Sequence, residues 1–418
     1  MRLVCHLSKK ESFLPRHATL SSVYDPSGAL IDQALVIYFA APRSFTGEEV
    51  VEIQCHGGLV VASMVLDALM KLGVRLAEPG EFSKRAFLNG RIDLTEAEAI
   101  AKLIEVKSVD AAKILAKQMK GELKSFVENI RDALIEILAF VEVNIDYAEE
   151  DLPLDLQDQM VEKLTVINHD LTKTLESSKR REGLINGFKV AIIGKPNVGK
   201  SSLLNTLLNF DRAIISEIAG TTRDTIEEEI KIGTHLVKIV DTAGIREATD
   251  TIERIGVERS KQAIDDSEIV VAMFDSSRED DIEDAQIIAL LKNYKEHKKI
   301  VTVLNKCDLP VKFDTSMVEG AIHVSCKNSV QPIVKVLKEY LDTQSMDEGL
   351  MLTSKRQSHA VSEALVTIQN SVELLEAGDL ELFAFELNLA INHISSITRP
   401  FDRDEILEKM FGSFCLGK

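Results

Sequence analysis

The sequence has no tryptophan and few aromatic residues of any kind. Aromatic side chains make up 5% of the 418 residues, whereas hydrophobic residues together make up 45%. The chain therefore has enough apolar material to fill buried cores, and those cores must be mainly aliphatic. A chain of this length is expected to form two or three domains.

Basic residues are too few to balance the acidic ones. The chain has 49 Lys and Arg against 67 Asp and Glu, which gives a net charge of −18. A broad nucleic-acid-binding surface needs clustered Lys and Arg, so this balance argues against one and leaves room only for a local basic patch.

Cysteines and long apolar runs are also scarce. The five cysteines form no C-x-x-C pair and show no Cys/His ligand spacing, which argues against a disulfide framework or a zinc site. The longest apolar run, residues 34–41, is far too short to span a bilayer, and the first residues lack the apolar core of a signal peptide. We expect a soluble cytoplasmic protein.

The first half of the chain changes from mixed to helical character. Residues 34–39 and 50–53 read as strands and residues 63–72 as a helix, which predicts a small α+β domain over residues 1–94. Residues 95–187 have helical periodicity. Thr95 and Glu98 match a capping box, with Leu94 as the hydrophobic staple.

The second half begins with alternating strands and helices over residues 188–343. This alternation predicts a parallel sheet with helices on both faces. Residues 344–418 are helical again, so we expect one helical domain interrupted by an inserted α/β domain. The expected strands are residues 190–193, 236–240, 269–274, 300–304 and 321–324.

Residues 194–201, GKPNVGKS, follow the first of these strands and precede an apolar helical segment. Strand, glycine-rich loop and helix in this order are the context of a phosphate-binding P-loop. Backbone N–H groups and the helix N-terminus would surround a phosphate. Lys200 would reach the β- and γ-phosphates, and the Ser201 hydroxyl would ligate Mg²⁺.

Four further signals follow the P-loop in the order expected of a guanine-specific GTPase. A threonine pair, Thr221 and Thr222, could complete the Mg²⁺ shell, and residues 241–244, DTAG, would sense the γ-phosphate. Asp308 of the NKCD stretch can accept two N–H bonds from guanine, a pattern that adenine does not offer. Residues 325–327, SCK, would close over the base.

Two features separate this site from small signalling GTPases. Ile245 stands where those proteins carry a glutamine that orients the attacking water, so another group must act, and residues 246–254 contain several candidate acids. No arginine is obviously placed as an internal finger. Positive charge near the phosphates must therefore come from elsewhere.

The whole chain resembles the MnmE (TrmE) family of tRNA-modifying GTPases. The resemblance rests on motifs in separate segments of the chain: SFTGE (44–48), VEI (51–53), CHGG (55–58), PGEF (79–82), RAFLNGRIDL (85–94), IAGTTRD (218–224), DTAGIRE (241–247) and FCLGK (414–418). The family's usual opening, with a Gly-rich segment and a folate-contacting arginine, comes before the region where this chain starts. We therefore expect a tetrahydrofolate-binding-type domain that is shortened at its start.

The resemblance implies functional residues. Glu52 and Arg91 match residues that contact a one-carbon tetrahydrofolate derivative, Glu253 matches the catalytic glutamate, and Cys415 matches a cysteine proposed to serve the modification chemistry. The implied K⁺ ligands are Asn197, Ser216, Ile218 and Thr221, and the implied Mg²⁺ ligands are Ser201 and Thr222. The expected GTP-binding residues are Asn197, Val198, Gly199, Lys200, Ser201, Ser202, Ser216, Glu217, Ile218, Ala219, Gly220, Thr221, Thr222, Asp241, Thr242, Ala243, Gly244, Asn305, Lys306, Asp308, Ser325, Cys326 and Lys327.

The resemblance also implies partners and a reaction. Family members hydrolyse GTP as homodimers whose GTPase domains pair around potassium. With the FAD-binding partner MnmG they modify the wobble uridine of certain tRNAs. Two alternatives stay open at this point: a regulatory GTPase of ribosome assembly that binds rRNA, and a scaffold in which GTP only drives domain closure. The sequence shows neither a KH-type G-x-x-G segment nor a basic tail.

Overall fold

The computed structural model describes residues 1–146, 154–210, 228–240, 261–346, 349–399, 411, 412 and 414. The chain divides into two compact units. The first consists of Met1–Ile104, Lys117–Asn168 and Ser354–Lys418, and the second of Glu105–Ala116 and His169–Thr353. Within the described residues, every helix is too short or too polar to cross a membrane.

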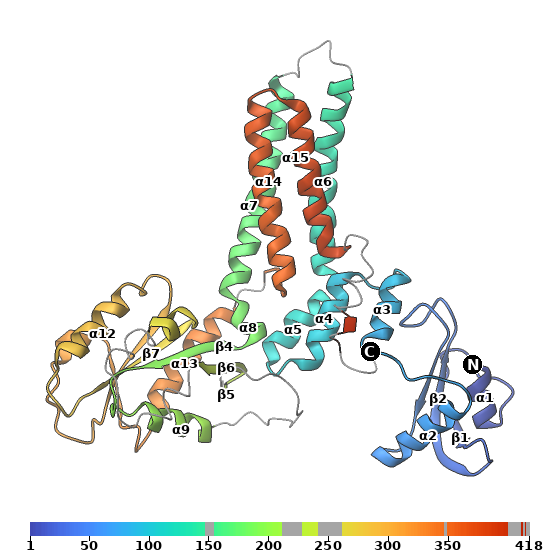
Figure 1. Cartoon of the computed structure of the whole chain (residues 1–418), viewed down its shortest axis with the longest axis horizontal. Helices are drawn as coiled ribbons and strands as arrows, with labels where there is room; N and C mark the ends of the chain where they lie inside the picture. Colours follow the sequence, from blue (N-terminus) through green and yellow to red (C-terminus); the bar gives the residue numbers. More distant parts are fainter. Residues whose placement is uncertain are drawn as a thin grey trace. The chain divides into compact units, whose positions relative to one another are not determined.

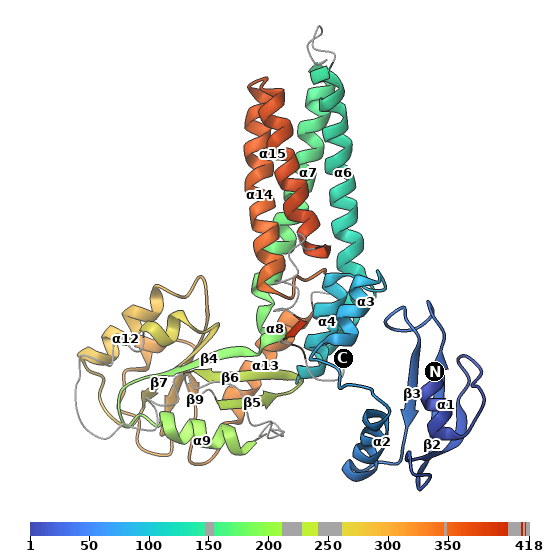
Figure 2. The same ribbon diagram turned by 45° about the vertical axis from the view of Figure 1, so that its right-hand side comes forward.

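The first unit begins with a three-stranded antiparallel sheet in the order β1-β2-β3. Figure 2 labels β2 and β3 of this sheet. Alternating side chains of β1 and β2 are buried against the flanking helices, and Val23, Ala34 and Val65 share one core with Leu7. This confirms the strands and the helix expected there, and the structure has in addition a first helix and a first strand that the sequence pattern did not indicate. The elements are α1 (Arg2–Ser8), β1 (Thr19–Tyr24), β2 (Leu30–Phe39), β3 (Val50–Gln54) and α2 (Leu59–Lys71).

Two further helices follow, α3 (Glu81–Leu88) and α4 (Leu94–Glu105). The predicted capping box at Thr95 is wrong, because α4 begins before that residue. Asp93 caps the helix instead: its Oδ1 accepts from the Glu96 backbone N at 2.8 Å, and the Glu96 carboxylate accepts from the Asp93 N at 2.7 Å. Each bond satisfies a donor at the start of the helix.

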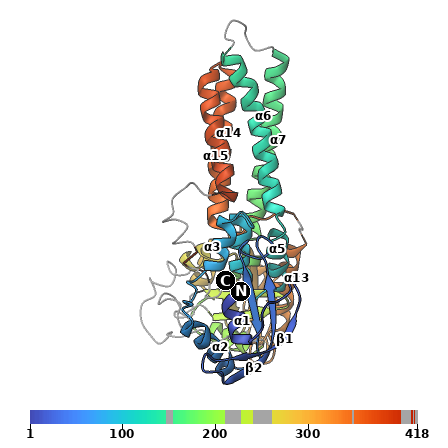
Figure 3. The same cartoon turned by 90° about the vertical axis from the view of Figure 1, so that its right-hand side faces the viewer.

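Long helices from both ends of the chain lie side by side in the first unit (Figures 1 and 3). Helix α15 packs on both α14 and α6. Their apolar residues recur at helical spacing and are buried, as with Leu134, Ile368 and Leu387. The long helices are α6 (Glu122–Asp146), α7 (Leu154–Arg180), α14 (Lys355–Glu376) and α15 (Leu380–Thr398). The residues of α7 from His169 on, and most of the shorter α5 (Val109–Gln118), belong to the second unit.

The second unit is built on a six-stranded sheet in the order β5-β6-β4-β7-β8-β9. Every neighbouring pair is parallel except β5 and β6. The expectation of a parallel sheet is therefore correct for its main part but wrong at the β5 edge, where a short turn joins antiparallel strands. The strands are β4 (Phe188–Ile193), β5 (Glu228–Ile232), β6 (His235–Val240), β7 (Ile269–Asp275), β8 (Lys299–Asn305) and β9 (Ile322–His323).

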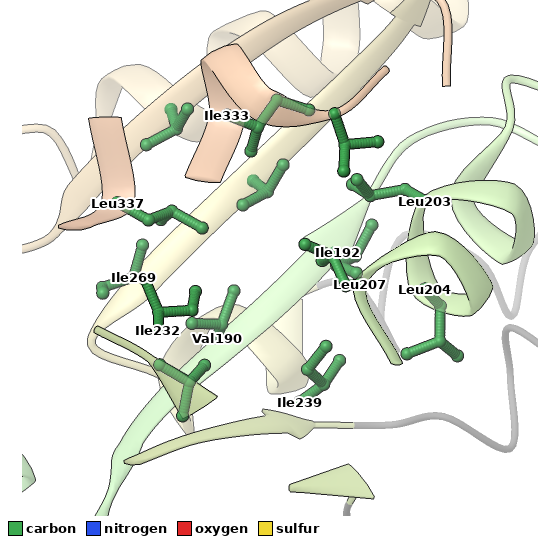
Figure 4. Packing of buried hydrophobic residues seen from close by; sticks show 14 of the residues in the cluster. Val190, Ile192, Leu203, Leu204, Leu207, Ile232, Ile239, Ile269, Ile333 and Leu337 are labelled. Atoms are coloured by element: carbon green, nitrogen blue, oxygen red, sulfur yellow. The ribbon is translucent and has the colours of Figure 1, made fainter. Parts of the chain in front are cut away.

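Helices cover both faces of this sheet. On one face, α9 (Lys200–Phe210) and α13 (Gln331–Ser345) bury Leu203 and Ile333 against β4, β6 and β7 (Figure 4). On the other face, α12 (Ile282–Lys292) buries Leu291. This is the doubly covered sheet expected for the inserted domain, and it places the carboxyl ends of β4, β7 and β8 at one edge, where ligands bind in such folds.

Candidate functional site

The loop between β4 and α9 has a backbone that only certain residues can adopt. Gly194 has φ 145°, and a Cβ at this position would lie 2.4 Å from the Met273 carbonyl oxygen. Asn197 has φ 62°, in the left-handed region that Asn tolerates better than most residues. The loop therefore passes very close to the end of β7, which explains why a residue without a side chain stands at position 194.

Lys200 lies at the first position of α9 and folds back over this loop. Its Nζ donates to the carbonyl oxygens of Gly194 at 2.6 Å and Lys195 at 2.8 Å. Burial lowers the pKa of the Lys200 ammonium. The ammonium is thus held over the loop by neutral carbonyl groups, which leaves its charge to act on an anion.

Asn305, at the end of β8, joins three segments of the site. Its Nδ2 donates to the Val198 carbonyl at 2.8 Å, and its Oδ1 accepts from the backbone N of Cys326 at 2.9 Å. Only 4% of this residue is exposed. Asn305 therefore fixes the P-loop and the loop after β9 relative to one another.

A cavity of about 430 Å³ lies where these segments meet. Asp308 is exposed at this cavity, and the Ser325 hydroxyl holds the pKa of its carboxyl below the usual value. An ionised carboxylate here accepts hydrogen bonds only. The lining residues are Asn197, Gly199, Lys200, Ser201, Ser202, Asn305, Lys306, Asp308, Leu309, Ser325, Cys326 and Lys327.

Lys306 lines the cavity and forms an ion pair with Asp275. Its Nζ donates to Asp275 Oδ2 at 2.6 Å, and it has φ 63°. Burial raises the pKa of Asp275, but the Lys306 and Ser277 hydrogen bonds outweigh it, so the net shift is downward. This pair fixes the Lys306 stem at the wall of the cavity.

The structure brings together the expected residues of the P-loop and of the two base-recognition motifs, with two differences in detail. Val198 is fully buried and does not line the cavity, and its carbonyl accepts from Asn305. Leu309 lines the cavity although no motif predicted it. Leu309 belongs to no motif, so the sequence alone gave no reason to expect it at the site.

Several expected site residues lie outside the described residues. These are Ser216, Glu217, Ile218, Ala219, Gly220, Thr221, Thr222, Asp241, Thr242, Ala243, Gly244, Glu253 and Cys415.

The two expected folate contacts lie in the first unit. Glu52 is exposed on β3 and accepts from Gln54 Nε2 at 3.4 Å, whereas the Arg91 Nε donates to the Ser44 carbonyl at 3.2 Å. Neither residue lines the cavity of about 310 Å³ that this unit contains, which lies between β3 and α3 and includes Glu48, Arg75 and Arg85.

Family models match nearly the whole chain. The MnmE helical domain matches residues 94–415, and the N-terminus of the GTP-binding protein TrmE matches residues 2–91. The chain belongs to the MnmE family. This family assignment confirms the expected enzyme class, a GTP hydrolase, and the expected fold class.

Curated relatives agree over the full length. The tRNA modification GTPase MnmE of Sulfurimonas denitrificans is 58% identical over 100% of this chain and 94% of its own length. The protein of the same name from Aliarcobacter butzleri is 56% identical with the same coverage. Among solved structures, the FeoB G-domain of Methanococcus jannaschii is 21% identical over 38% of this chain and 98% of its own, with a TM-score of 0.25, a likeness too weak to carry an argument.

Proposed function

We propose that this protein hydrolyses GTP at the cavity beside α9 and that it uses the hydrolysis in modifying the wobble uridine of tRNA, together with the FAD-binding partner MnmG. The observation that carries the proposal is the match over the whole chain to relatives named tRNA modification GTPase. The lining of the cavity, which combines P-loop and base-recognition residues, supports it.

Different residues at the cavity would bind the base and the phosphates of GTP. The Asp308 carboxylate, which is exposed at the cavity, accepts the two N–H groups of the guanine edge. Lys200 keeps the Lys195 carbonyl as an acceptor and turns its other N–H groups to the β- and γ-phosphates, where it stabilises charge. Asn305 holds the base-binding loop and the phosphate-binding loop in fixed positions relative to one another.

The chain also has residues suited to the two metal ions. Ser201 is exposed at the cavity, and its hydroxyl is a hard oxygen ligand suited to Mg²⁺, with Thr222 as the second protein ligand. A bound Mg²⁺ would neutralise phosphate charge. Asn197 offers an amide oxygen at the same cavity for K⁺, and Ser216, Ile218 and Thr221 complete that set.

The remaining roles follow the family. Glu253 would orient the attacking water in place of the glutamine that Ile245 replaces, Glu52 and Arg91 would bind a one-carbon tetrahydrofolate derivative, and Cys415 would serve the modification chemistry. Glu52 suits this role, because its carboxylate is exposed on β3, where it accepts a long hydrogen bond of 3.4 Å from Gln54. We further propose a cytoplasmic homodimer as the active form.

GTP turnover in potassium and in sodium buffer at equal ionic strength tests the ion site. We expect clear stimulation by potassium, and we expect Asn197→Gly to remove it. Glycine tolerates the left-handed backbone of residue 197, so this variant deletes the amide oxygen without adding strain. Equal rates of the parent protein in both buffers would contradict the potassium site and leave the GTPase assignment intact.

A bacterial strain lacking its own MnmE tests the tRNA function. Expression of this chain should restore the modified wobble uridine, measured by mass spectrometry of tRNA nucleosides. Lys200→Ala should fail to restore it at equal protein level. Restoration by Lys200→Ala would separate the modification from GTP binding and contradict the coupling.

A further inference from the structure

Lys195 is a buried lysine in the P-loop, at a position that the P-loop pattern leaves free. Its side chain is 4% exposed, and its Nζ contacts Asp281 and also Asp284, the latter at 2.6 Å. A lysine is almost never fully buried unless it is paired. The P-loop is therefore joined by a buried ion pair to the start of α12, 86 to 89 residues later in the chain.

The two carboxylates have fixed positions of their own. Asp281 is the N-cap of α12, and its Oδ1 accepts from the backbone N of Glu283 and of Asp284. The side chain of Asp284 is 1% exposed, and its Oδ2 also accepts from the Asp281 N at 3.3 Å. Among the described residues, Lys195 is the only cation paired with either carboxylate.

The same residue touches the phosphate-binding lysine through its backbone. The carbonyl oxygen of Lys195 accepts a hydrogen bond from Lys200 Nζ at 2.8 Å, and Gly194 supplies the second acceptor. The side chain of Lys195 thus fixes one end of the loop to α12, and its carbonyl holds the ammonium of Lys200 over the loop. Burial in a rigid surrounding gives such a contact a defined geometry.

We propose that Lys195 is a positioning residue for GTP binding: its ion pair with Asp281 and Asp284 holds the P-loop carbonyls that aim Lys200 at the phosphates. The inference rests on the proposed function, because it takes Lys200 to contact the β- and γ-phosphates. Without the ion pair, the charge on Asp284 is buried and unpaired, and the loop and α12 separate. Lys200 then loses its fixed acceptor, and the triphosphate loses more than the diphosphate because it has the additional γ-phosphate.

A double-mutant cycle on the full-length protein tests this. The proteins compared are the parent, Lys195→Met, Lys200→Ala and the double variant, titrated with fluorescent GDP and with a fluorescent non-hydrolysable GTP analogue. Met matches the length of the buried lysine stem and removes the ammonium group, with both its charge and its hydrogen bonds to the two carboxylates. We expect Lys195→Met to weaken binding of the analogue roughly tenfold and binding of GDP clearly less. In the Lys200→Ala background, Lys195→Met should cause no further loss of affinity.

Lys298→Met is the matched control. Lys298 is also partly buried in the second unit and donates to the carbonyls of Ile264, Asp265 and Ser267, away from the cavity. Lys298→Met should lower the unfolding temperature and leave the ratio of the affinities for the GTP analogue and for GDP unchanged. If Lys195→Met does not fold, Asp284→Asn replaces it in the cycle, with a smaller loss in the same direction.

The outcomes separate the two proposals. If the fold-losses in affinity of Lys195→Met and Lys200→Ala multiply in the double variant, the positioning role is wrong. It is also wrong if Lys195→Met weakens both nucleotides equally. Neither result would change the assignment of the site. A Lys200→Ala variant that binds the analogue as well as the parent does would overturn the assignment of the site, and the positioning role with it.

Discussion

The carboxylate of Glu98 accepts two hydrogen bonds from the guanidinium of Arg356, which lies 258 residues later in the chain. Nε donates at 2.8 Å and Nη2 at 3.1 Å. Arg356 Nη1 donates to the Ser396 carbonyl and Nη2 also to the Ile397 carbonyl at the end of α15, and Gln357 also donates to Glu98 at 2.6 Å. This cluster therefore connects α4 with α14 and α15, the helices that precede and follow the inserted GTPase domain.

Replacing Arg356 tests the importance of this connection for the first unit. The side chain of Glu98 is 10% exposed, so Arg356→Met leaves a largely buried carboxylate without its cation. We expect a loss of about 3 kcal/mol in the free energy of unfolding of the first unit, measured by urea denaturation. Arg131→Met is the control, because Arg131 pairs with an exposed neighbour, Asp132, and should change stability by at most about 0.5 kcal/mol. Equal effects would contradict the role of the cluster.

Gly199→Ala should damage the nucleotide site through Asn305. A Cβ at residue 199 would lie 2.1 Å from Asn305 Nδ2, and Asn305 is held at both ends of its amide. The amide must move, which breaks its bond to Val198 and separates the two loops. We expect at least about a tenfold loss in GTP affinity, measured with a fluorescent nucleotide. Gly320→Ala is the control, because it has φ 75° but meets no atom within 4 Å. A similar loss in that variant would assign the effect to backbone strain alone.

Asp308→Asn should change the preferred base. The carboxylate accepts two N–H bonds from guanine, whereas an amide presents one donor and one acceptor. The variant should bind GTP on the order of 100-fold more weakly, from the loss of two charge-assisted hydrogen bonds. It should bind xanthosine triphosphate better than the parent does, because xanthine has a carbonyl at the position of the guanine amino group. Competition titrations measure both effects, and unchanged GTP affinity would exclude Asp308 from base recognition.

Glu81 should make the stability of the first unit depend on pH in the acid range. Hydrogen bonds from Arg75, with further ones from the Glu78 backbone N and Arg85, lower the pKa of Glu81 from 4.5 to about 2. A lowered pKa in the folded state means that the stabilisation is complete above pH 4.5 and is lost as the pH falls towards 2. Thermal unfolding between pH 5 and 2.5 should therefore show a smaller decline in Glu81→Gln than in the parent.

Glu78→Gln is the control for that measurement, because it removes a neighbouring carboxylate but keeps the backbone N–H that Glu81 accepts. It should follow the parent curve. If Glu81→Gln and the parent decline in parallel, Glu81 is not the source of the acid sensitivity.

Local chemistry made much of the nucleotide site predictable. A P-loop depends on residue types at fixed spacing within one strand, loop and helix, so Gly194, Lys200 and Ser201 were recognisable without a structure. The capping box was not predictable in this way, because Asp93 and Thr95 both have side chains able to cap a helix. In the structure Asp93 caps the helix, and the Glu98 carboxylate that a capping box at Thr95 would have needed accepts from Arg356 instead.

By itself, the sequence determined the class of enzyme, five of the six strands of the inserted domain and the P-loop between β4 and α9, because these follow from patterns of neighbouring residues. Only the tertiary structure decided that β5 runs antiparallel to β6, that Asn305 joins two loops, and that Lys195 pairs with Asp281 and Asp284. Those features depend on contacts between residues far apart in the chain. The stability of such a contact depends on how far it is buried and on which group it pairs with, and neither can be predicted from neighbouring residues in the sequence.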